Sequence, residues 1–264
     1  MPLHIIEKNI CETPLELAER FKKEKTDYEI KKYSYCGKLD PMARGKMLLL
    51  TNETCKQQDE LIKIDKTYQF TMVFGIETDT YDVLGIIQNP NNILYKHTEE
   101  DIQSQIQYHT LNKFNNIDQL FVGKKEQEFP PYSSICVKNK DGLRNPLWWW
   151  SKNNRYDEII PPHKEVEIYS LKFLSHNTIS FHTLHTSIKN NIKKIKGNFR
   201  QNETLLNWEQ LYNDNNDKSL LSIKFEAKVS SGTYIRSLIQ DIAKYYNTKA
   251  IAIDINRTHL HFDY

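Results

Sequence analysis

The stretch LSIKFEAKVSSGTYIRSLIQDIA, residues 221–243, changes its apolar period within a few positions. Every second residue of its first half is apolar, as on one face of a β-strand, because successive strand side chains point to opposite faces. These strand residues are Leu221, Ile223, Phe225, Ala227 and Val229. Positions i, i+3, i+4 and i+7 of the second half are apolar, namely Ile235, Leu238, Ile239 and Ile242. This is the spacing of an amphipathic helix, so we predict a strand that runs through a Ser-Ser-Gly-Thr turn into a helix.

Two other segments have the alternation of strands. Residues 66–74 predict a strand that ends at Gly75. The run EVEIYSLKFLSHNTISFHTL, residues 165–184, predicts two strands joined as a hairpin through residues 175–177. The chain is therefore expected to build a sheet.

Helix and loop signals lie earlier in the chain. Thr13 is suited to be a helix N-cap, with Pro14 at the first helical position and Glu16 completing a capping box. A second, short helix is predicted at about 99–109. Proline pairs and an Asp-Gly step predict loops from about 110 to 162.

The composition is that of a soluble globular protein. The 264 residues are 39% hydrophobic and 27% charged, with a formal net charge of +2, and they suffice for one large domain or two small ones. No long apolar run predicts a membrane span or a signal peptide, so we expect an intracellular, cytoplasmic protein. The four cysteines are far apart and form no CxxC pair, so no zinc knuckle or disulfide framework is predicted.

Several familiar classes of catalytic site are missing from the sequence. It has no HExxH, GxxxxGK[ST], GxGxxG or GxSxG motif, which argues against metalloproteases, common nucleotide-binding proteins and serine hydrolases. We therefore expect no cofactor and no metal. Short basic runs at 21–25, 123–125 and 192–200 are suited either to a solvated face or to local RNA binding.

Asp40 lies in a constrained loop, YCGKLDPMARG, residues 35–45. Pro41 biases the aspartate toward extended backbone, while Gly37 and Gly45 permit close backbone approach on either side. An ordinary turn would also explain this motif. Arg236 raises a matching question, because a cation in the first turn of a helix opposes the helix dipole. A nearby carboxylate such as Asp40 would compensate it, and exposure to solvent is the alternative.

Two further aspartates occur in the segment TDTYD, residues 78–82. Oxygen ligands of this kind suit a hard cation such as Mg²⁺. Aspartates in a threonine-rich turn after a strand also serve hydrogen bonding, and we prefer that interpretation of Asp79 and Asp82.

The sequence blocks as a set resemble the TruB family of tRNA pseudouridine synthases. The blocks follow in the family's order and are YCGKLDPMARG (35–45), DKTYQFTMVFGIETDTYDVLG (65–85), FPPYSSICVKNKDG (129–142), SSGTYIRSLIQDIA (230–243) and INRTHL (255–260). The resemblance implies an α+β pseudouridine synthase catalytic fold with a mixed, largely antiparallel central sheet flanked by helices and loops. It also implies one catalytic domain over residues 1–264, with a variable insertion at about 90–165 and no C-terminal PUA-type RNA-binding domain.

The resemblance further implies isomerisation of a uridine in tRNA, without metal or cofactor. The target that it favours is U55 in the T-loop. Asp40 matches the family's catalytic aspartate, and Arg236 matches the arginine that pairs with it, for which we expect bidentate contact. Tyr68 matches the tyrosine that stacks on the target base and is placed to assist deprotonation. Tyr234 and Ile255 match positions that line the pocket of a flipped base.

Two departures from the family pattern concern substrate contact. Tyr35 occupies the place of a histidine that helps to hold the everted loop, and together with Lys38 it is assigned to substrate binding. The family's Lys-Pro-x-Gly-x-Thr-Ser lead-in is here EKNICETP, residues 7–14. The run Trp148-Trp149-Trp150 falls in the insertion, where the rings are suited either to stack on bases or to pack in a core.

The expected partner is the T-arm stem-loop of tRNA, bound by a monomer that requires no protein partner and no membrane. RNA of this kind is read by shape, backbone and unstacked bases, so a mild net charge is sufficient. One alternative is a guide-RNA-dependent, dyskerin-like synthase subunit. Another is a non-catalytic RNA-binding or folding module.

Overall fold

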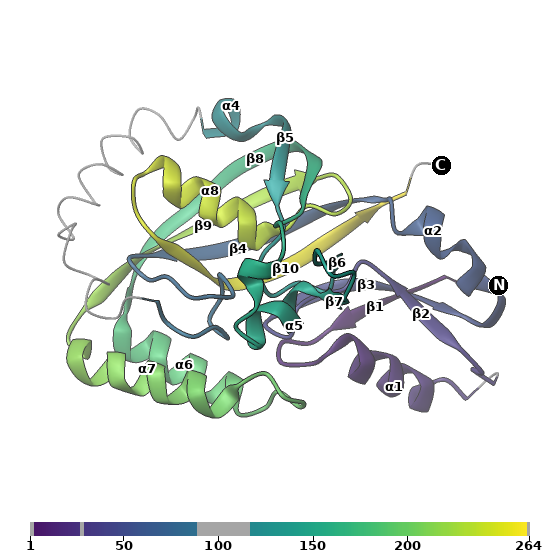
Figure 1. Cartoon of the computed structure of the whole chain (residues 1–264), viewed down its shortest axis with the longest axis horizontal. Helices are drawn as coiled ribbons and strands as arrows, with labels where there is room; N and C mark the ends of the chain where they lie inside the picture. The colour runs from purple at the N-terminus through teal and green to yellow at the C-terminus, as the bar shows by residue number, and fades with distance from the viewer. Residues whose placement is uncertain (1–2, 27–28, 89–116, 263–264) are drawn as a thin grey trace.

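The structure is a computed structural model, and it describes residues 3–26, 29–88 and 117–262. A large sheet runs through the whole molecule (Figure 1). Its strands are β1 (His4–Lys8), β2 (Tyr33–Cys36), β3 (Ala43–Thr51), β4 (Asp65–Phe74), β5 (Gly123–Glu128), β8 (His163–Ser180), β9 (Ser219–Val229) and β10 (Ala250–His261).

The sheet has eight strands in the order β1-β3-β10-β4-β9-β8-β5, with β2 paired to β3 beside this path. Among the described strands, only β3 and β10 are parallel neighbours, and every other pair in this sheet is antiparallel. The predicted mixed, largely antiparallel sheet is therefore confirmed. The parallel pair aligns Ile255 with Ala43, which brings the end of the Asp40 loop beside β10.

Helices pack around this sheet, and the described residues contain no helix long and apolar enough to cross a membrane. The α-helices are α1 (Pro14–Glu24), α2 (Gln58–Leu61), α4 (Ile117–Phe121), α5 (Leu147–Lys152), α6 (Phe181–Ile192), α7 (Gln201–Asn215) and α8 (Ile235–Tyr245). Two 3₁₀ turns are η1 (Asn52–Gln57) and η4 (Tyr156–Glu158). The fold is thus α+β, as predicted.

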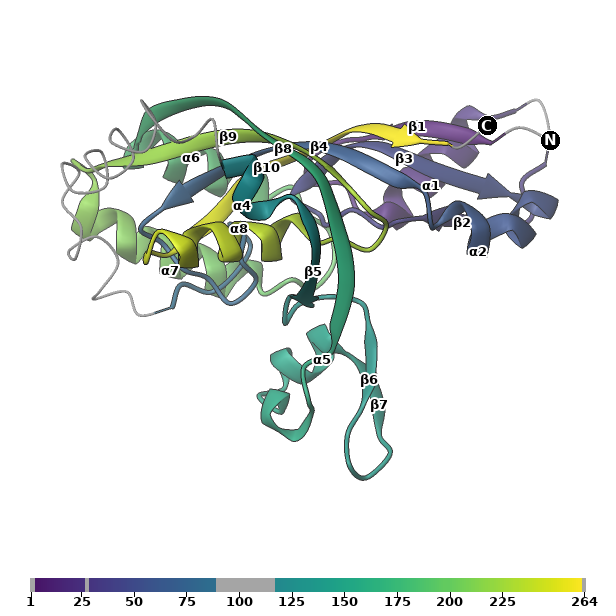
Figure 2. The same ribbon diagram turned by 90° about the horizontal axis from the view of Figure 1, so that it is seen from above.

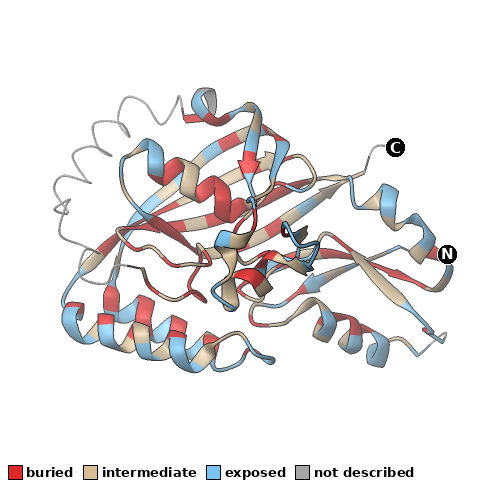
Figure 3. Cartoon of the chain, in the orientation of Figure 1, coloured by how far each residue is buried: buried red, intermediate tan, exposed pale blue. Residues whose placement is uncertain are grey.

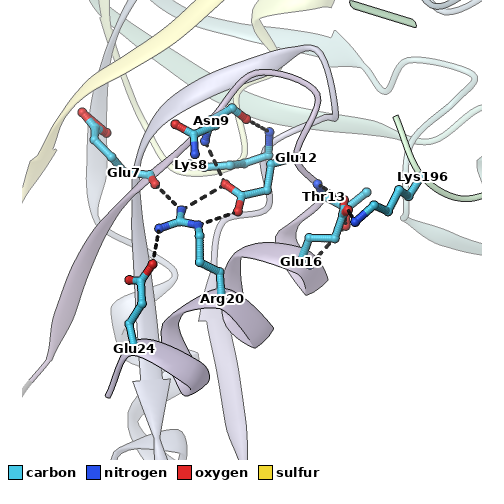
Figure 4. Close-up of polar contacts among 9 residues, drawn as sticks. All are labelled: Glu7, Lys8, Asn9, Glu12, Thr13, Glu16, Arg20, Glu24 and Lys196. Atoms are coloured by element: carbon cyan, nitrogen blue, oxygen red, sulfur yellow. Dashed lines mark hydrogen bonds and ion pairs between the residues drawn. The ribbon is translucent and has the colours of Figure 1, made fainter. Parts of the chain in front are cut away.

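Helix α1 begins where its capping signals predict. The Thr13 hydroxyl accepts from the Glu16 amide at 3.2 Å, and the Glu16 carboxylate accepts from the Thr13 amide at 2.9 Å. Arg20 reaches back from α1 to the Glu12 carboxylate at 2.8 Å and to the Glu7 carbonyl at 2.8 Å (Figure 4). These contacts fix the turn between β1 and α1, which lies against the Asp40 loop.

The strand-to-helix segment forms the centre of the main core. All five apolar residues predicted on one face of β9 are buried, and so are the four predicted on the inner face of α8. They belong to one cluster with Phe70, Met72 and Phe74 of β4 (Figure 3). The core therefore fixes α8 on the sheet, with Arg236 in the first turn of the helix.

A second core lies beneath helices α6 and α7, which run side by side (Figure 1). Trp208, Phe181 and Ile188 are buried there with Val73 and Ile251 of the sheet. This pair of helices was not predicted from the sequence. Residues 165–184 do not form a hairpin, and that prediction was wrong. They form the single strand β8, followed by α6.

The reason is that β8 finds its partner much later in the chain. The expected turn residues Ser175, His176 and Asn177 pair with β9, and a register irregularity between Phe173 and Ser175 absorbs the polar break. The alternation of side chains was read correctly, but the pairing partner was not. Register cannot be deduced from one strand alone.

The region expected to be loops contains regular elements. Residues 123–128 form the edge strand β5, and a small sheet pairs β6 (Cys136–Lys138) with β7 (Arg144–Pro146). The segment with β6, β7 and α5 extends away from the large sheet on the side of α8 (Figure 2). The expectation of loops is wrong for these residues. The predicted helix at 99–109, and part of the predicted insertion, lie outside the described residues.

Candidate active site

Asp40 lies in the loop between β2 and β3, whose backbone is held by hydrogen bonds to nearby segments. The Ala43 amide donates to the Asp40 carbonyl at 3.0 Å, and the Cys11 amide donates to the Pro41 carbonyl at 2.8 Å. Lys8, which is 2% exposed, donates from Nζ to the Ala43 carbonyl at 2.6 Å. The backbone of the loop is thereby fixed while the Asp40 side chain remains 37% exposed and can reach a ligand.

Gly37 and Gly45 both have the positive φ angles that other residues rarely adopt, at 73° and 108°. A Cβ atom on Gly45 would overlap the Arg257 carbonyl, and one on Gly37 would lie 3.0 Å from Arg257 Nη1. The predicted close backbone approach is therefore confirmed at Gly45, whereas the close neighbour at Gly37 is the Arg257 side chain.

Arg236 is buried and reaches Asp40 from the first turn of α8. Its Nε atom lies 2.8 Å from Asp40 Oδ2, although among the described residues Nε has no acceptor in hydrogen-bonding geometry, so the contact acts through charge. Nη1 donates to the Thr80 carbonyl at 2.6 Å and Nη2 to the Tyr132 carbonyl at 3.2 Å. The ion pair is present, but the bidentate contact we expected is wrong, because two backbone carbonyls occupy the other two nitrogens.

A second carboxylate, Asp82, contributes to the charge balance of this arginine. Asp82 is buried and accepts from the Thr80 hydroxyl at 2.6 Å and from the Leu84 amide at 2.9 Å. Burial raises the pKa of Asp82, and the charge of Arg236 opposes that rise. Burial alone would lower the pKa of Arg236, but the attraction to Asp40 and Asp82 outweighs it and raises that pKa. The positive charge of Arg236 in the first turn of α8 is thus balanced by two carboxylates, Asp40 and Asp82.

The other aspartate of the TDTYD segment also has protein partners. Asp79 forms two contacts with Arg200, at 2.6 and 3.1 Å, and accepts from the Ile86 amide at 2.8 Å. The hydrogen-bonding interpretation of Asp79 and Asp82 is therefore confirmed.

Tyr68 is buried on β4 close to Arg257, a buried arginine of β10 that was not among the predicted site residues. Arg257 is 1% exposed and donates from Nη1 to the Tyr68 hydroxyl at 3.5 Å. It also donates to the Lys46 carbonyl at 2.7 Å and to the Gly37 carbonyl at 2.8 Å. Arg257 thus ties Tyr68 to the Asp40 loop. Its only sequence signal was its place in the INRTHL block.

Tyr234 is half-buried directly before α8, with its ring edge-on to Phe129 at 5.5 Å between centroids. Burial and the charge of Asp40 raise the pKa of Tyr234. Gln127 of β5 accepts from the Tyr234 amide at 2.8 Å and donates to its carbonyl at 3.2 Å. Residues of β5 therefore hold the backbone that precedes Arg236.

The remaining predicted site residues fall into two groups. Ile255 is buried in the same cluster as Leu39 and Tyr68, which places it on the apolar side of the site. Tyr35 and Lys38 contact each other, with Lys38 Nζ 5.8 Å from the ring centroid. Within the described residues, neither of them forms a hydrogen bond or an ion pair with Asp40 or Arg236. The structure thus assembles Asp40, Arg236, Tyr68, Tyr234 and Ile255 more directly than Tyr35 and Lys38.

The three tryptophans have different environments. Trp150 is fully buried and donates to the Asn145 carbonyl at 3.1 Å, while Trp148 is 44% exposed. Arg155 lies over the rings of Trp149 and Trp150, at 5.4 and 5.5 Å from their centroids. Core packing therefore explains Trp150, and Trp148 is the ring available for contact with a ligand.

Comparisons with known proteins point in one direction. The family model for "TruB family pseudouridylate synthase (N terminal domain)" matches residues 25–199. The tRNA pseudouridine synthase B of Mycoplasma mobile is 32% identical over 229 residues, covering 86% of this chain and 58% of that protein. The protein of the same name from Caldicellulosiruptor saccharolyticus is 28% identical over 227 residues, covering 86% and 57%. The chain thus spans less than two thirds of the length of these relatives.

A solved structure shares the fold. A chain in the crystal structure of a Cbf5-Nop10-Gar1 complex matches with a TM-score of 0.51 and 16% sequence identity. The match covers 98% of the present chain and 48% of that chain. At this identity the likeness concerns the architecture of the sheet and its helices.

Proposed function

Because this chain belongs to the TruB family of pseudouridylate synthases, we propose that it isomerises a uridine of tRNA to pseudouridine. In that reaction the bond from ribose C1′ to base N1 breaks and a bond from C1′ to C5 forms. The hydrogen of C5 is lost as a proton and N1 takes one up, so the product is an isomer of the substrate. The names of the relatives, each a tRNA pseudouridine synthase B, support tRNA as the substrate.

The observation that carries this proposal is the ion pair between Asp40 and Arg236, 2.8 Å apart. Asp40 is the catalytic carboxylate, which attacks the sugar or removes a proton while the glycosidic bond breaks. Arg236 pairs with that carboxylate and orients it from the buried side, so its exposed side faces the substrate. The charge of a buried guanidinium acts strongly here because little water screens it.

The aromatic residues supply the pocket for the base. Tyr68 stacks on the flipped uracil and is placed to assist deprotonation, while Tyr234 and Ile255 line the pocket. Tyr35 and Lys38 contact the RNA outside the pocket. We take U55 of the T-loop as the target and the T-arm stem-loop as the bound element, with the protein acting without an obligatory protein partner.

The test compares purified wild type with an Asp40→Asn variant on unmodified tRNA transcripts. Pseudouridine is mapped by chemical labelling and primer extension, on transcripts with and without a uridine at position 55. We expect wild type to modify that uridine and Asp40→Asn to be slower by at least about a thousandfold. Asp254→Asn, which changes a carboxylate paired with the exposed Arg44, is the matched control and should keep full activity.

Each other outcome has a definite meaning. If wild type binds tRNA but forms no pseudouridine in any RNA, the chain is an RNA-binding module. Activity that appears only with an added guide RNA assigns the chain to the guide-dependent branch. Activity that persists in Asp40→Asn removes Asp40 from the catalytic role.

A further inference from the structure

Arg236 depends on two backbone carbonyls for its orientation, and both belong to segments outside α8. Nη1 donates to the Thr80 carbonyl, and Nη2 donates to the Tyr132 carbonyl. Thr80 lies in the segment after β4, and Tyr132 lies at the base of the projecting segment that carries β6, β7 and α5. The direction of the guanidinium therefore depends on how firmly these two segments are held.

One residue of the α6–α7 region contacts both segments. Arg200, directly before α7, forms its two contacts with Asp79, the neighbour of Thr80 in the chain. The same guanidinium lies over the ring of Tyr132, at 4.3 Å from the centroid. Arg200 thus contacts Asp79, which precedes Thr80 in the chain, and Tyr132, whose carbonyl accepts from Arg236 Nη2.

The backbone conformation of Arg200 is unfavourable for an arginine, which indicates that its side chain makes contacts that offset this cost. Arg200 has a φ of 61°, a left-handed conformation that costs an ordinary residue roughly 1–2 kcal/mol and that glycine or asparagine adopts more readily. Its side chain is 16% exposed and that of Asp79 is 22% exposed, so water screens their contact only partly. The contacts of the guanidinium with Asp79 and Tyr132 explain why an arginine occupies this strained position.

Helix α7 reinforces the same segment through two further contacts. The Thr204 hydroxyl donates to the Leu84 carbonyl at 3.0 Å, and the Trp208 indole donates to the Val83 carbonyl at 3.1 Å. Both donors are buried. The segment from Thr78 to Gly85 is therefore attached to α7 at several points, and Arg200 is the one that also reaches Tyr132.

We propose that Arg200 is a positioning residue for the isomerisation, which holds the two carbonyls that orient Arg236 toward Asp40. The inference rests on the proposed function. It extends that function to the α6–α7 region, which supplies none of the predicted site residues. Its role is indirect, since Arg200 contacts Asp79 and Tyr132 rather than Asp40.

The experiment measures single-turnover pseudouridine formation and, separately, tRNA affinity. Arg200→Asn keeps a residue that tolerates the left-handed backbone, and Asp79→Asn keeps the size of the side chain. We expect both to lower the single-turnover rate by about tenfold or more while tRNA affinity changes by less than about threefold. Lys189→Ala is the matched control, because Lys189 forms a half-exposed pair with Glu209 in the same helical region.

A double variant separates positioning from general stability. If Arg200 acts through Arg236, adding Arg200→Asn to Arg236→Lys lowers the rate less than the product of the two single losses. Arg200→Lys should recover part of the rate lost in Arg200→Asn, because it restores the charge without the planar fork.

Several results would overturn the proposal. These are unchanged rates in Arg200→Asn and Asp79→Asn, a loss confined to tRNA affinity, an equal loss in Lys189→Ala, or fully multiplicative losses in the double variant. A wild-type protein that forms no pseudouridine contradicts the proposed function instead, so the two failures are distinguishable.

Discussion

Arg257 donates from Nη2 to the Gly37 carbonyl at 2.8 Å, so β10 holds the backbone three residues ahead of Asp40. The same guanidinium donates from Nε to the Lys46 carbonyl, on the other side of the loop. One buried side chain therefore spans the loop that carries Asp40.

We predict that Arg257→Lys weakens both the fold and the reaction. A lysine cannot satisfy both carbonyls with a planar fork, and a buried carbonyl without a donor costs roughly 1–3 kcal/mol. Urea unfolding should show that loss of stability, and the pseudouridine rate should fall with it. Arg44→Lys is the control, because Arg44 pairs with Asp254 at an exposed site where such a contact is worth about 1 kcal/mol or less. Equal effects at the two positions would contradict this role of Arg257.

Gly37→Ala is expected to be more harmful than Gly142→Ala. Both glycines have positive φ angles, 73° and 82°, so each substitution carries a similar backbone cost of roughly 1–2 kcal/mol. A Cβ on Gly37 would also crowd Arg257, whereas no atom of the part of the chain that the structure describes lies within 4 Å of one on Gly142. The difference between the two unfolding free energies measures the crowding. We expect only Gly37→Ala to slow pseudouridine formation. If Gly142→Ala slowed it as well, the cause would be the backbone conformation rather than crowding of Arg257.

Because Lys8 is buried, we expect the free energy of unfolding to change with pH in the alkaline range. Burial lowers the pKa of Lys8 to about 8, although Glu12 and Asp40 oppose the shift. Between about pH 8 and the unfolded value of about 10.4, the unfolded chain holds a proton that the folded protein has lost. This group therefore adds stability as pH rises, by up to about 1.4 kcal/mol per pH unit.

The measurement compares wild type with Lys8→Met by urea unfolding from about pH 7.5 to about pH 9.5. The stability of wild type relative to Lys8→Met should increase across that range. Lys193→Met removes an exposed lysine and should follow wild type in its pH dependence. A constant difference between wild type and Lys8→Met would show that burial does not shift this lysine.

Trp148→Ala and Trp150→Ala should affect different properties, tRNA affinity and stability respectively. Trp150 is fully buried, so its truncation should cost about 3–5 kcal/mol and loosen the projecting segment. Trp148 is largely free of the core, so Trp148→Ala should leave the unfolding free energy unchanged while tRNA affinity decreases by about 1–3 kcal/mol if the ring stacks on a base. Unchanged affinity in Trp148→Ala would exclude that stacking.

Elements with local signals were predicted well. The alternation in β9, the spacing in α8 and the capping box of α1 each depend on residues that are close in the chain. The partner of β8 was not predicted, because Ser175 pairs with Lys224, far along the sequence. The order of strands is decided by such distant pairings, which a single sequence does not display.

The candidate site was predicted only in part, for a related reason. Asp40 and Arg236 were found because each lies in a motif with its own pattern. Lys8, Arg200 and Arg257 were not, because their partners are backbone carbonyls or side chains from distant segments. Arg200, for example, pairs with a residue 121 positions earlier. A buried cation has no local pattern that distinguishes it from an exposed one.

The α6–α7 region leaves the sheet and returns to the same place in it, since Ser180 at the end of β8 pairs with Ser219 at the start of β9. A short turn could therefore join the two strands without altering the register of any other strand. The helices are thus dispensable for the path of the backbone, yet they cover Val73 and Ile251 and supply Arg200. Arg200 lies in the connection between α6 and α7, the part of this excursion farthest along the chain from Ser180 and Ser219, so a change in the length of that connection would displace the residue that contacts Asp79 and Tyr132.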